Sequence, residues 1–441
     1  MTAAPVTHDD AEVLFAPLAH LPRVALAVSG GPDSLALMHL TAQWCAARSD
    51  GPELVVLTVD HGLRTDSRDE ALLVSRAAEA ASLLHVILTW EHDGVDEGLQ
   101  VRAREARYDL MAAYAHAHDI GALVTAHHLD DQAETFLMRL ARGSGLDGLA
   151  AIPEEGSWAG LTLLRPLLDV PKARLVATVE AAGIAYVTDL SNIDPKFERG
   201  RVRSAMETLA GFGLSADAIA LSAKRLRRAR AALDAAAYDF LDSHAETSAA
   251  GYASVDAGAT DALPEEVALR VLSRLLATVG GGMEPVRLAK LEALYAALKE
   301  SPDKAHTLAR CRIAPKGGRL FVFREMRHEG LPELELSPGE RTLWDNRFAI
   351  ELGAAEEAPI IVRALGEEGV RVLREREAMP ASLPGPAAQA LPACWRGRRL
   401  LCLPDFGQVE PFMSPLSRHE EGLDCRARFL TGLGATKGPG Y

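Results

Sequence analysis

The chain has 441 residues, 48% of them hydrophobic, which is enough for two or three domains with separate cores. No window approaches the about 18 consecutive apolar residues of a membrane span, and the polar start MTAAPVTHDD is unlike a secretory signal. These features favour a cytoplasmic enzyme or binding protein with no membrane partner, and the net charge of −14 weighs against nucleic acid unless cations are clustered.

Four short segments rich in Val, Leu and Ala recur in the first 130 residues and predict buried parallel strands. Stretches with helical spacing lie between them, for example 34–47 and 66–82. This alternation predicts an α/β domain with a doubly wound sheet. The four segments are RVALAVS (23–29), ELVVLTVD (53–60), LHVILTW (84–90) and ALVTAH (122–127).

The sequence SGGPDS follows the first predicted strand and begins a helix. Its glycines permit positive φ and close approach of a ligand, and a helix N-terminus directs free N–H groups at the turn. We expect a pyrophosphate nest in which Ser29 and Ser34 donate their hydroxyls and Asp33 holds a magnesium ion. A glycine corner with an Asp or Ser N-cap is the weaker alternative. The residues assigned to the nest are Ser29, Gly30, Gly31, Pro32, Asp33 and Ser34.

This turn is neither a Walker P-loop nor a dinucleotide-binding turn, because GxxxxGK[ST] and GxGxxG are both absent. The spelling SGGxDS resembles the PP-loop of the ATP pyrophosphatase superfamily. The resemblance implies cleavage of ATP to AMP and pyrophosphate, with an oxygen of the substrate activated as an adenylate. The superfamily includes GMP and asparagine synthetases, tRNA thiolation enzymes and tRNA(Ile)-lysidine synthetases.

Two further segments carry polar groups that suit a nucleotide. VDHGLR ends the second strand, and His61 there either contacts the nucleotide at the carboxyl edge of the sheet or belongs to an ordinary strand-exit turn. In LQVRAREARYDLM, Arg104, Arg107 and Tyr108 share one helix face. The two guanidiniums either clamp a phosphate or pair with surface carboxylates, which is the commoner arrangement.

The fourth predicted strand ends in the polar segment TAHHLDDQAET. His127 and His128 lie at the strand end, and Asp131 and Glu134 lie one turn apart on the following helix, so both carboxylates can face one cleft. Such a pair can seat a cationic amine, accept its proton or hold a metal. Capping of the helix explains either carboxylate but not the density of polar groups. A zinc site is a weaker interpretation, because the spacing of these residues does not match a known closed set of zinc ligands.

Six motifs in this order closely resemble those of the tRNA(Ile)-lysidine synthetases. The resemblance covers roughly the first 215 residues, and the last motif is peculiar to that family. Gly200 departs from the pattern, since the family usually has Asn there. The motifs are SGGPDS, VDHGLR, ARxxRY, HHLDDQAET, RGSGLDGL and DLSNIDPKFERGRVR.

The resemblance implies that ATP and Mg²⁺ activate the C2 oxygen of the wobble cytidine in the CAU anticodon of an isoleucine tRNA as an adenylate. The ε-amine of free L-lysine, whose pKa is about 10.4, then displaces AMP as a neutral nucleophile. Asp131 and Glu134 are the candidates for binding and deprotonating lysine. Arg107, with Arg104 beside it, would steady the phosphate. His127 would contact the nucleotide or the flipped cytidine.

The residue composition of the chain changes near residue 205. Ala-, Leu- and Arg-rich helical stretches at 215–245 and 264–299 flank a Gly-, Ala- and Ser-containing stretch, and short strand-like pieces separated by Gly and Pro follow. We therefore expect a doubly wound parallel sheet of PP-loop type, followed by a helical domain and a small β-containing C-terminal domain. The expected domains are 1–214 (catalytic), 215–304 (helical, tRNA-binding) and 305–441 (β-containing).

Three basic clusters stand out against the acidic background: FERGRVR (197–203), KRLRRAR (224–230) and WRGRRL (395–400). A single run of this kind is more typical of a solvated helix face. Three runs on an acidic chain make contact with phosphate about as probable as that interpretation. The resemblance implies that these clusters and the two C-terminal domains hold the tRNA.

Other functions fit less well. A thiolase of the same superfamily would need reactive cysteines near the nucleotide, but the five cysteines are scattered without a CxxC pair, and Cys45 stands alone in a predicted helix. A glutamine-dependent synthetase would need a nucleophile motif that is missing. A non-catalytic nucleotide- or tRNA-binding protein is disfavoured by the intact Asp33, Asp131 and Glu134. The oligomeric state is left open, with a homodimer among the options.

Overall fold

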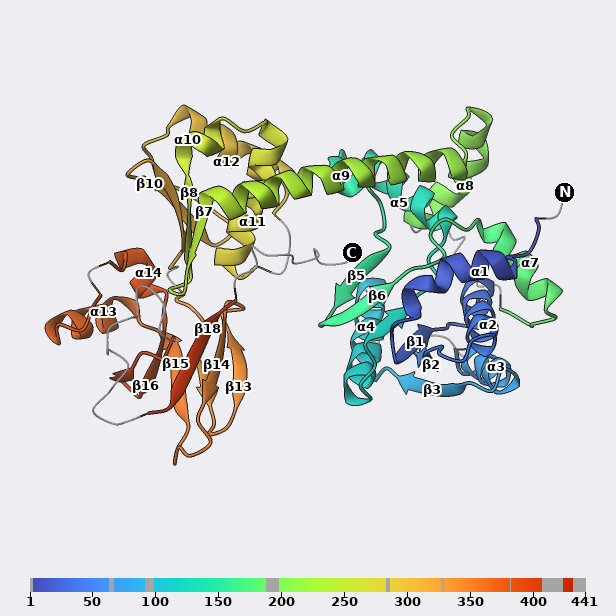
Figure 1. The fold of residues 1–441 in the computed structure, drawn as a ribbon, viewed down its shortest axis with the longest axis horizontal. Helices are drawn as coiled ribbons and strands as arrows, with labels where there is room; N and C mark the ends of the chain where they lie inside the picture. Colours follow the sequence, from blue (N-terminus) through green and yellow to red (C-terminus); the bar gives the residue numbers. More distant parts are fainter. Residues whose placement is uncertain are drawn as a thin grey trace. The chain divides into compact units, whose positions relative to one another are not determined.

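In the computed structural model, the chain forms two compact units that divide between Arg230 and Ala231, inside helix α9 (Ala216–His244) (Figure 1). Each unit is described by itself. The structure describes residues 3–62, 67–91, 99–187, 198–282, 286–326, 329–380, 382–406 and 423–430.

The first unit is built on a six-stranded sheet of order β3-β2-β1-β4-β6-β5. Neighbouring strands are parallel except for the β5–β6 hairpin at one edge, so the predicted parallel sheet is confirmed with an antiparallel strand added. The order reverses at β1, which places the carboxyl ends of β1 and β4 at a topological switch point, where such sheets bind ligands. The strands are β1 (Arg23–Ala27), β2 (Glu53–Asp60), β3 (Leu84–Thr89), β4 (Ala122–Val124), β5 (Glu155–Trp158) and β6 (Leu161–Leu164).

Both faces of this sheet are covered, which explains the continuous apolar runs of its central strands. Side chains alternate along β1: Leu26 belongs to a core with Trp44 of α2, whereas Ala25 belongs to a second core with Tyr108 and Met111 of α4. The helices predicted at 34–47, 66–82 and 99–111 are therefore confirmed as the covering layers. The helices are α1 (His8–Phe15), α2 (Pro32–Ala46), α3 (Ser67–Ala80), α4 (Leu99–Ala117), α5 (Leu129–Ala141), α6 (Leu146–Leu149), α7 (Lys172–Ala181) and α8 (Glu198–Gly211).

The second unit contains a five-stranded antiparallel sheet of order β7-β8-β11-β10-β9, covered by the helices of the expected helical segment. Two of its strands come from the stretch around 247–263 and three from beyond residue 305, so an expected boundary at 304 crosses a single sheet. These elements are β7 (Ala245–Ser248), β8 (Tyr252–Asp256), α10 (Ala257–Asp261), α11 (Glu265–Gly280), α12 (Leu288–Glu300), β9 (His306–Leu308), β10 (Cys311–Lys316) and β11 (Arg319–Arg324).

The rest of the second unit is the predicted β-containing part, with one four-stranded sheet of order β12-β15-β16-β17 and one three-stranded sheet of order β13-β14-β18 around a shared core. All five cysteines of the chain are free thiols and four of them are buried, as the sequence indicates. The elements are β12 (Leu334–Leu336), β13 (Arg341–Trp344), β14 (Phe348–Leu352), β15 (Ile360–Ala364), α13 (Gly366–Glu375), α14 (Gly385–Gln389), β16 (Pro392–Arg396), β17 (Arg399–Cys402) and β18 (Cys425–Phe429).

None of the helices in the described ranges combines the length and the apolar character that crossing a membrane requires.

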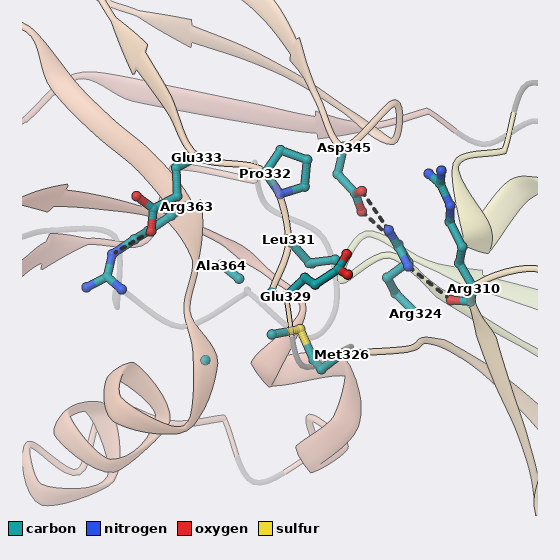
Figure 2. A pocket seen from close by; sticks show the side chains of 12 residues that line it. Arg310, Arg324, Met326, Glu329, Leu331, Pro332, Glu333, Asp345, Arg363 and Ala364 are labelled. Carbon is teal, nitrogen blue, oxygen red and sulfur yellow. Dashed lines mark hydrogen bonds and ion pairs between the residues drawn. The ribbon is translucent and has the colours of Figure 1, made fainter.

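A buried ion cluster joins the two sheet systems of the second unit. The carboxylate of Asp345 accepts two hydrogen bonds from Arg324, at 2.9 and 2.8 Å, and one from Nε of Arg347 at 2.7 Å. Burial lowers the pKa of Arg347 to about 10, against the attraction of Asp345, so the guanidinium remains charged at neutral pH. Arg324 and Asp345 also line a cavity of about 640 Å³ (Figure 2), and none of the predicted site residues lines it.

Replacing Asp345 with alanine should leave two buried guanidiniums without a counterion. We expect Asp345→Ala to lower the free energy of unfolding by about 3–5 kcal/mol, measured by urea denaturation. Asp261→Ala, which removes an exposed partner of Lys299, should change it by less than about 1 kcal/mol. Equal effects of the two substitutions would contradict the compensating role of Asp345.

Candidate active site

The turn between β1 and α2 has the conformation that its glycines predict. Gly30 has a φ of +84°, in the left-handed region, and Gly31 is extended directly before Pro32 at the first helical position. The hydroxyl of Ser34 accepts a hydrogen bond from the N–H of Ser29 at 3.1 Å and donates one to the carbonyl of Gly31 at 3.0 Å. Ser34 thus braces the turn, and the nest residues are held together at the N-terminus of α2.

Asp33 lies in the first turn of α2 and faces cations. Its Oδ2 is 3.3 Å from Nζ of Lys172 and 3.5 Å from Nε2 of His128. Its Oδ1 is buried without a hydrogen-bond partner. An orphaned carboxylate oxygen at a phosphate nest fits a Mg²⁺ ion, which proteins bind through one or two carboxylates together with substrate phosphates. Among the described residues no group of three potential protein ligands could hold a metal ion, so phosphate and water would complete the coordination.

His128 links this turn to the segment that follows β4. Its side chain is buried, and Nε2 lies 3.5 Å from Asp33 and 3.6 Å from Asp131, while Nδ1 lies 3.7 Å from Asp130. Burial alone would lower the pKa of His128, but Asp33, Asp131 and Asp130 oppose it by more and raise that pKa above its ordinary value. These contacts favour the protonated form of the imidazole, which lies between carboxylates from two loops.

Asp131 and Glu134 lie one turn apart on α5, as predicted, but their surroundings differ. Burial opposes ionisation of Asp131, yet the positive charge of His128 and a hydrogen bond from its N–H lower the pKa of Asp131 below its ordinary value. Glu134 is only 2% exposed and lies between two arginines of α8, 2.6 Å from Arg203 and 3.3 Å from Arg199. Burial raises the pKa of Glu134, and the arginines offset only part of that effect.

Arg104 and Arg107 of α4 are placed together, as the helical spacing predicts. Their Cζ atoms lie 5.2 and 5.3 Å from the centre of the Tyr108 ring. In the described part of the chain neither guanidinium pairs with a surface carboxylate, which disfavours the surface interpretation. Arg165 is 1% exposed, and its Nε and Nη2 atoms have no hydrogen-bond partner. Burial lowers the pKa of both Arg104 and Arg165.

His127 faces these cations from the end of β4. Its Nδ1 is 2.8 Å from the hydroxyl of Thr125. Burial is the largest effect and lowers the pKa of His127 to about 3, with Arg165 and Arg104 adding to it. The imidazole is therefore neutral at physiological pH and can exchange hydrogen bonds without carrying charge.

His61 lies at the end of β2, beside the end of β1 in the sheet. The neighbouring Asp60 accepts hydrogen bonds from the N–H of Gly62 at 3.0 Å and the hydroxyl of Ser67 at 2.6 Å. This is the geometry of a strand-exit turn at the edge where the nest lies. A contact between His61 and a nucleotide remains a prediction.

Several site residues were missed by the sequence analysis. Lys172 carried one signal, since it is the first residue of α7 and a cation at a helix N-terminus opposes the helix dipole. Arg165 carried none, because its place depends on how its loop packs. In the motif at 189–203, residues up to 197 lie outside the described residues, and the remainder begins α8. The missed residues are His128, Arg165, Lys172, Arg199 and Arg203.

Sequence comparisons relate this chain to known proteins. A family model described as a PP-loop domain matches residues 6–209. A tRNA(Ile)-lysidine synthase of Bradyrhizobium is 47% identical over 66% of this chain and 83% of its own length. The enzyme of that name from Ruegeria pomeroyi is 35% identical over 90% of this chain and 92% of its own. A solved U34-tRNA thiolase of Methanococcus maripaludis, 18% identical, covers 50% of this chain and 78% of its own with a TM-score of 0.42.

Alanine substitutions separate the two roles of the glycines. Gly30→Ala places a Cβ at positive φ and should lower the free energy of unfolding by about 1–2 kcal/mol. Gly31 has a φ that any residue can adopt, and a Cβ at this position would meet only Ser29 Oγ, at 4.0 Å. Gly31→Ala should therefore change the free energy of unfolding by less than about 0.5 kcal/mol. If phosphate approaches this backbone, Gly31→Ala should still weaken ATP binding by about tenfold or more in calorimetric titration. Unchanged ATP affinity would contradict the nest.

The low pKa of His127 predicts a stability change with pH. Unfolded histidine has a pKa of about 6.5, so below that pH the unfolded chain takes up a proton that His127 in the folded protein refuses. Wild-type stability is therefore lost on acidification, and His127→Gln should remove that loss. We expect the free energy of unfolding of the variant, minus that of the wild type, to increase as the pH falls below about 6.5. The increase should be up to about 1.4 kcal/mol for each pH unit, measured by urea denaturation. A constant difference would contradict a neutral buried His127.

Proposed function

The chain belongs to the tRNA(Ile)-lysidine synthase family, and we propose from this that it joins L-lysine to C2 of the wobble cytidine in the CAU anticodon of an isoleucine tRNA, with ATP as the activating substrate. One observation carries the proposal at residue level: Asp33 of the PP-loop and Asp131 of the HHLDDQAET motif share one buried histidine, His128. This shared contact supports a single site in which the turn would bind phosphate and the carboxylate of Asp131 would bind an amine.

ATP would bind with its phosphates at the N-terminus of α2. The N–H groups of the turn and the ammonium of Lys172 would face the phosphates, and the orphaned Oδ1 of Asp33 would hold Mg²⁺. A bound Mg²⁺ would neutralise part of the charge on the pyrophosphate. This arrangement favours departure of pyrophosphate from the α-phosphorus.

In the first step, the C2 oxygen of cytidine attacks the α-phosphorus, the bond to pyrophosphate breaks, and an adenylate forms on the base. Arg104, Arg107 and Arg165 would face the negative charge that develops on the phosphorus oxygens, because their guanidiniums have no carboxylate partners among the described residues. Neutral His127 would hydrogen-bond the nucleotide or the base beside them.

In the second step, the lysine amine attacks C2 and the C2–O bond breaks to release AMP. The carboxylates of Asp131 and Glu134 would have different roles, because their pKa values are displaced in opposite directions. Ionised Asp131 would anchor the ammonium form. Glu134, whose raised pKa makes it the stronger base and whose Oε2 has no hydrogen-bond partner, would take the proton.

Thiolase chemistry is less compatible with the structure. Cys45 is the only cysteine in the first unit, and burial raises the pKa of its thiol to about 11. A reactive cysteine needs a lowered pKa, since the thiolate is the nucleophile. A ligase acting in the cytoplasm on tRNA therefore remains the function that fits best.

A neutral isostere tests the role of Asp131. Asp131→Asn keeps an oxygen that can accept the hydrogen bond from the N–H of His128 but removes the charge. We expect ATP binding in calorimetry to be retained and incorporation of labelled lysine into the CAU-anticodon isoleucine tRNA to fall by at least about a hundredfold.

Asp9→Asn is the matched control, because it removes the same charge from an exposed position on α1, a helix that contributes none of the site residues. It should retain most lysine incorporation. Loss of ATP binding in Asp131→Asn would instead assign Asp131 to the nucleotide site.

A further inference from the structure

The basic cluster at 224–230 is divided by the structure into two groups with different surroundings. All five of its cations lie on α9, within the first unit. Lys224 pairs with Asp169, Arg227 with Glu154 at 3.0 Å, and Arg230 with Asp147 at 3.2 Å. These three cations follow one another at intervals of three residues, so they form one side of the helix.

The three ion pairs of Lys224, Arg227 and Arg230 hold α9 against other segments of the first unit. Asp169 precedes Lys172 by three residues, so one of these ion pairs ends on the loop that carries the lysine beside the phosphate nest. The part of the helix around Lys224 therefore lies beside the segment that carries Lys172. This side of the cluster is accounted for without any external partner.

Arg225 and Arg228 project from another side of the same helix. Both are exposed, and neither has an ion pair or hydrogen bond among the described residues. Leu221, one turn before Arg225 on this side, is 47% exposed, so nothing in the described part of the unit covers this strip. No acidic residue lies within four positions of either arginine in the sequence. Their charges are therefore uncompensated on a chain with a net charge of −14.

We propose that Arg225 and Arg228 form a phosphate-contacting strip that binds the backbone of the tRNA substrate, whereas Lys224, Arg227 and Arg230 only hold the helix in place. This inference rests on the proposed function for the identity of the RNA. An exposed pair of guanidiniums without local acids attracts a polyanion and releases its counterions. An acidic protein repels such a partner over the rest of its surface, so contact is favoured where cations are uncompensated.

The structure supplies a matched pair of variants for the test. Arg225→Gln/Arg228→Gln and Lys224→Gln/Arg227→Gln change the net charge equally and lie on the same turns of α9. Binding of the CAU-anticodon isoleucine tRNA transcript would be measured by fluorescence anisotropy at several salt concentrations. Thermal unfolding and ATP binding without tRNA would report whether each variant is folded.

We expect Arg225→Gln/Arg228→Gln to weaken tRNA binding on the order of tenfold and to reduce the slope of log K against log[salt] by about 1 to 2. The KM for tRNA should rise by a similar factor. Lys224→Gln/Arg227→Gln should keep the wild-type slope, because its cations are already paired with carboxylates. Equal slopes for the two folded variants, or an unchanged slope for Arg225→Gln/Arg228→Gln, would overturn the inference.

The same measurements test the proposed function separately from the RNA-binding strip. If the wild-type protein binds tRNA with the expected slopes but incorporates no lysine, the lysidine reaction is wrong and the RNA-binding strip stands. If lysine is incorporated but the slopes are equal, the strip is wrong and the reaction stands.

Discussion

The buried contact of His128 with Asp33 and Asp131 is the interaction on which the site depends. Asp33 belongs to the turn after β1 and Asp131 to the helix after β4, and these strands are neighbours where the strand order reverses. A parallel sheet brings the two loops together, and the His128 side chain lies 3.5 and 3.6 Å from a carboxylate of each. One imidazole thereby contacts both the turn that we propose binds pyrophosphate and the carboxylate that we propose binds the amine.

Adjacent residues in this site acquire opposite properties from their surroundings. Desolvation lowers the pKa of half-buried His127, with Arg165 and Arg104 adding to the effect and Asp131 opposing it, whereas the carboxylates around His128 raise its pKa. Asp131 and Glu134 show the same divergence, because Asp131 faces the positive His128 and burial dominates at Glu134. Pairs of like groups with separated pKa values divide acid and base roles, which a reaction with a phosphoryl step and an amine step requires.

Local sequence determined much of the first unit and less of the second. The strand at 53–60 and the turn at 29–34 were predictable, since apolar runs and a glycine-rich strand exit act over short ranges. Arg165 and Lys172 were not, because their positions depend on the packing of one loop against two others. The strands β7 and β8 were missed since their Ala and Ser residues carry weak strand signals. Their hairpin is completed by antiparallel pairing of β8 with β11, which is distant in the sequence.

An acidic chain that acts on a polyanion must place its cations selectively, and the three basic clusters show how. Arg199 and Arg203 of the first cluster enclose Glu134 inside the site. The second cluster is divided between ion pairs and uncovered arginines on one helix. Arg396 and Arg398 of the third lie exposed around the turn at Gly397, which has a φ of +58°. Runs of similar composition thus serve different purposes, because the number of nearby carboxylates, and not the number of cations, decides which charges remain available to RNA.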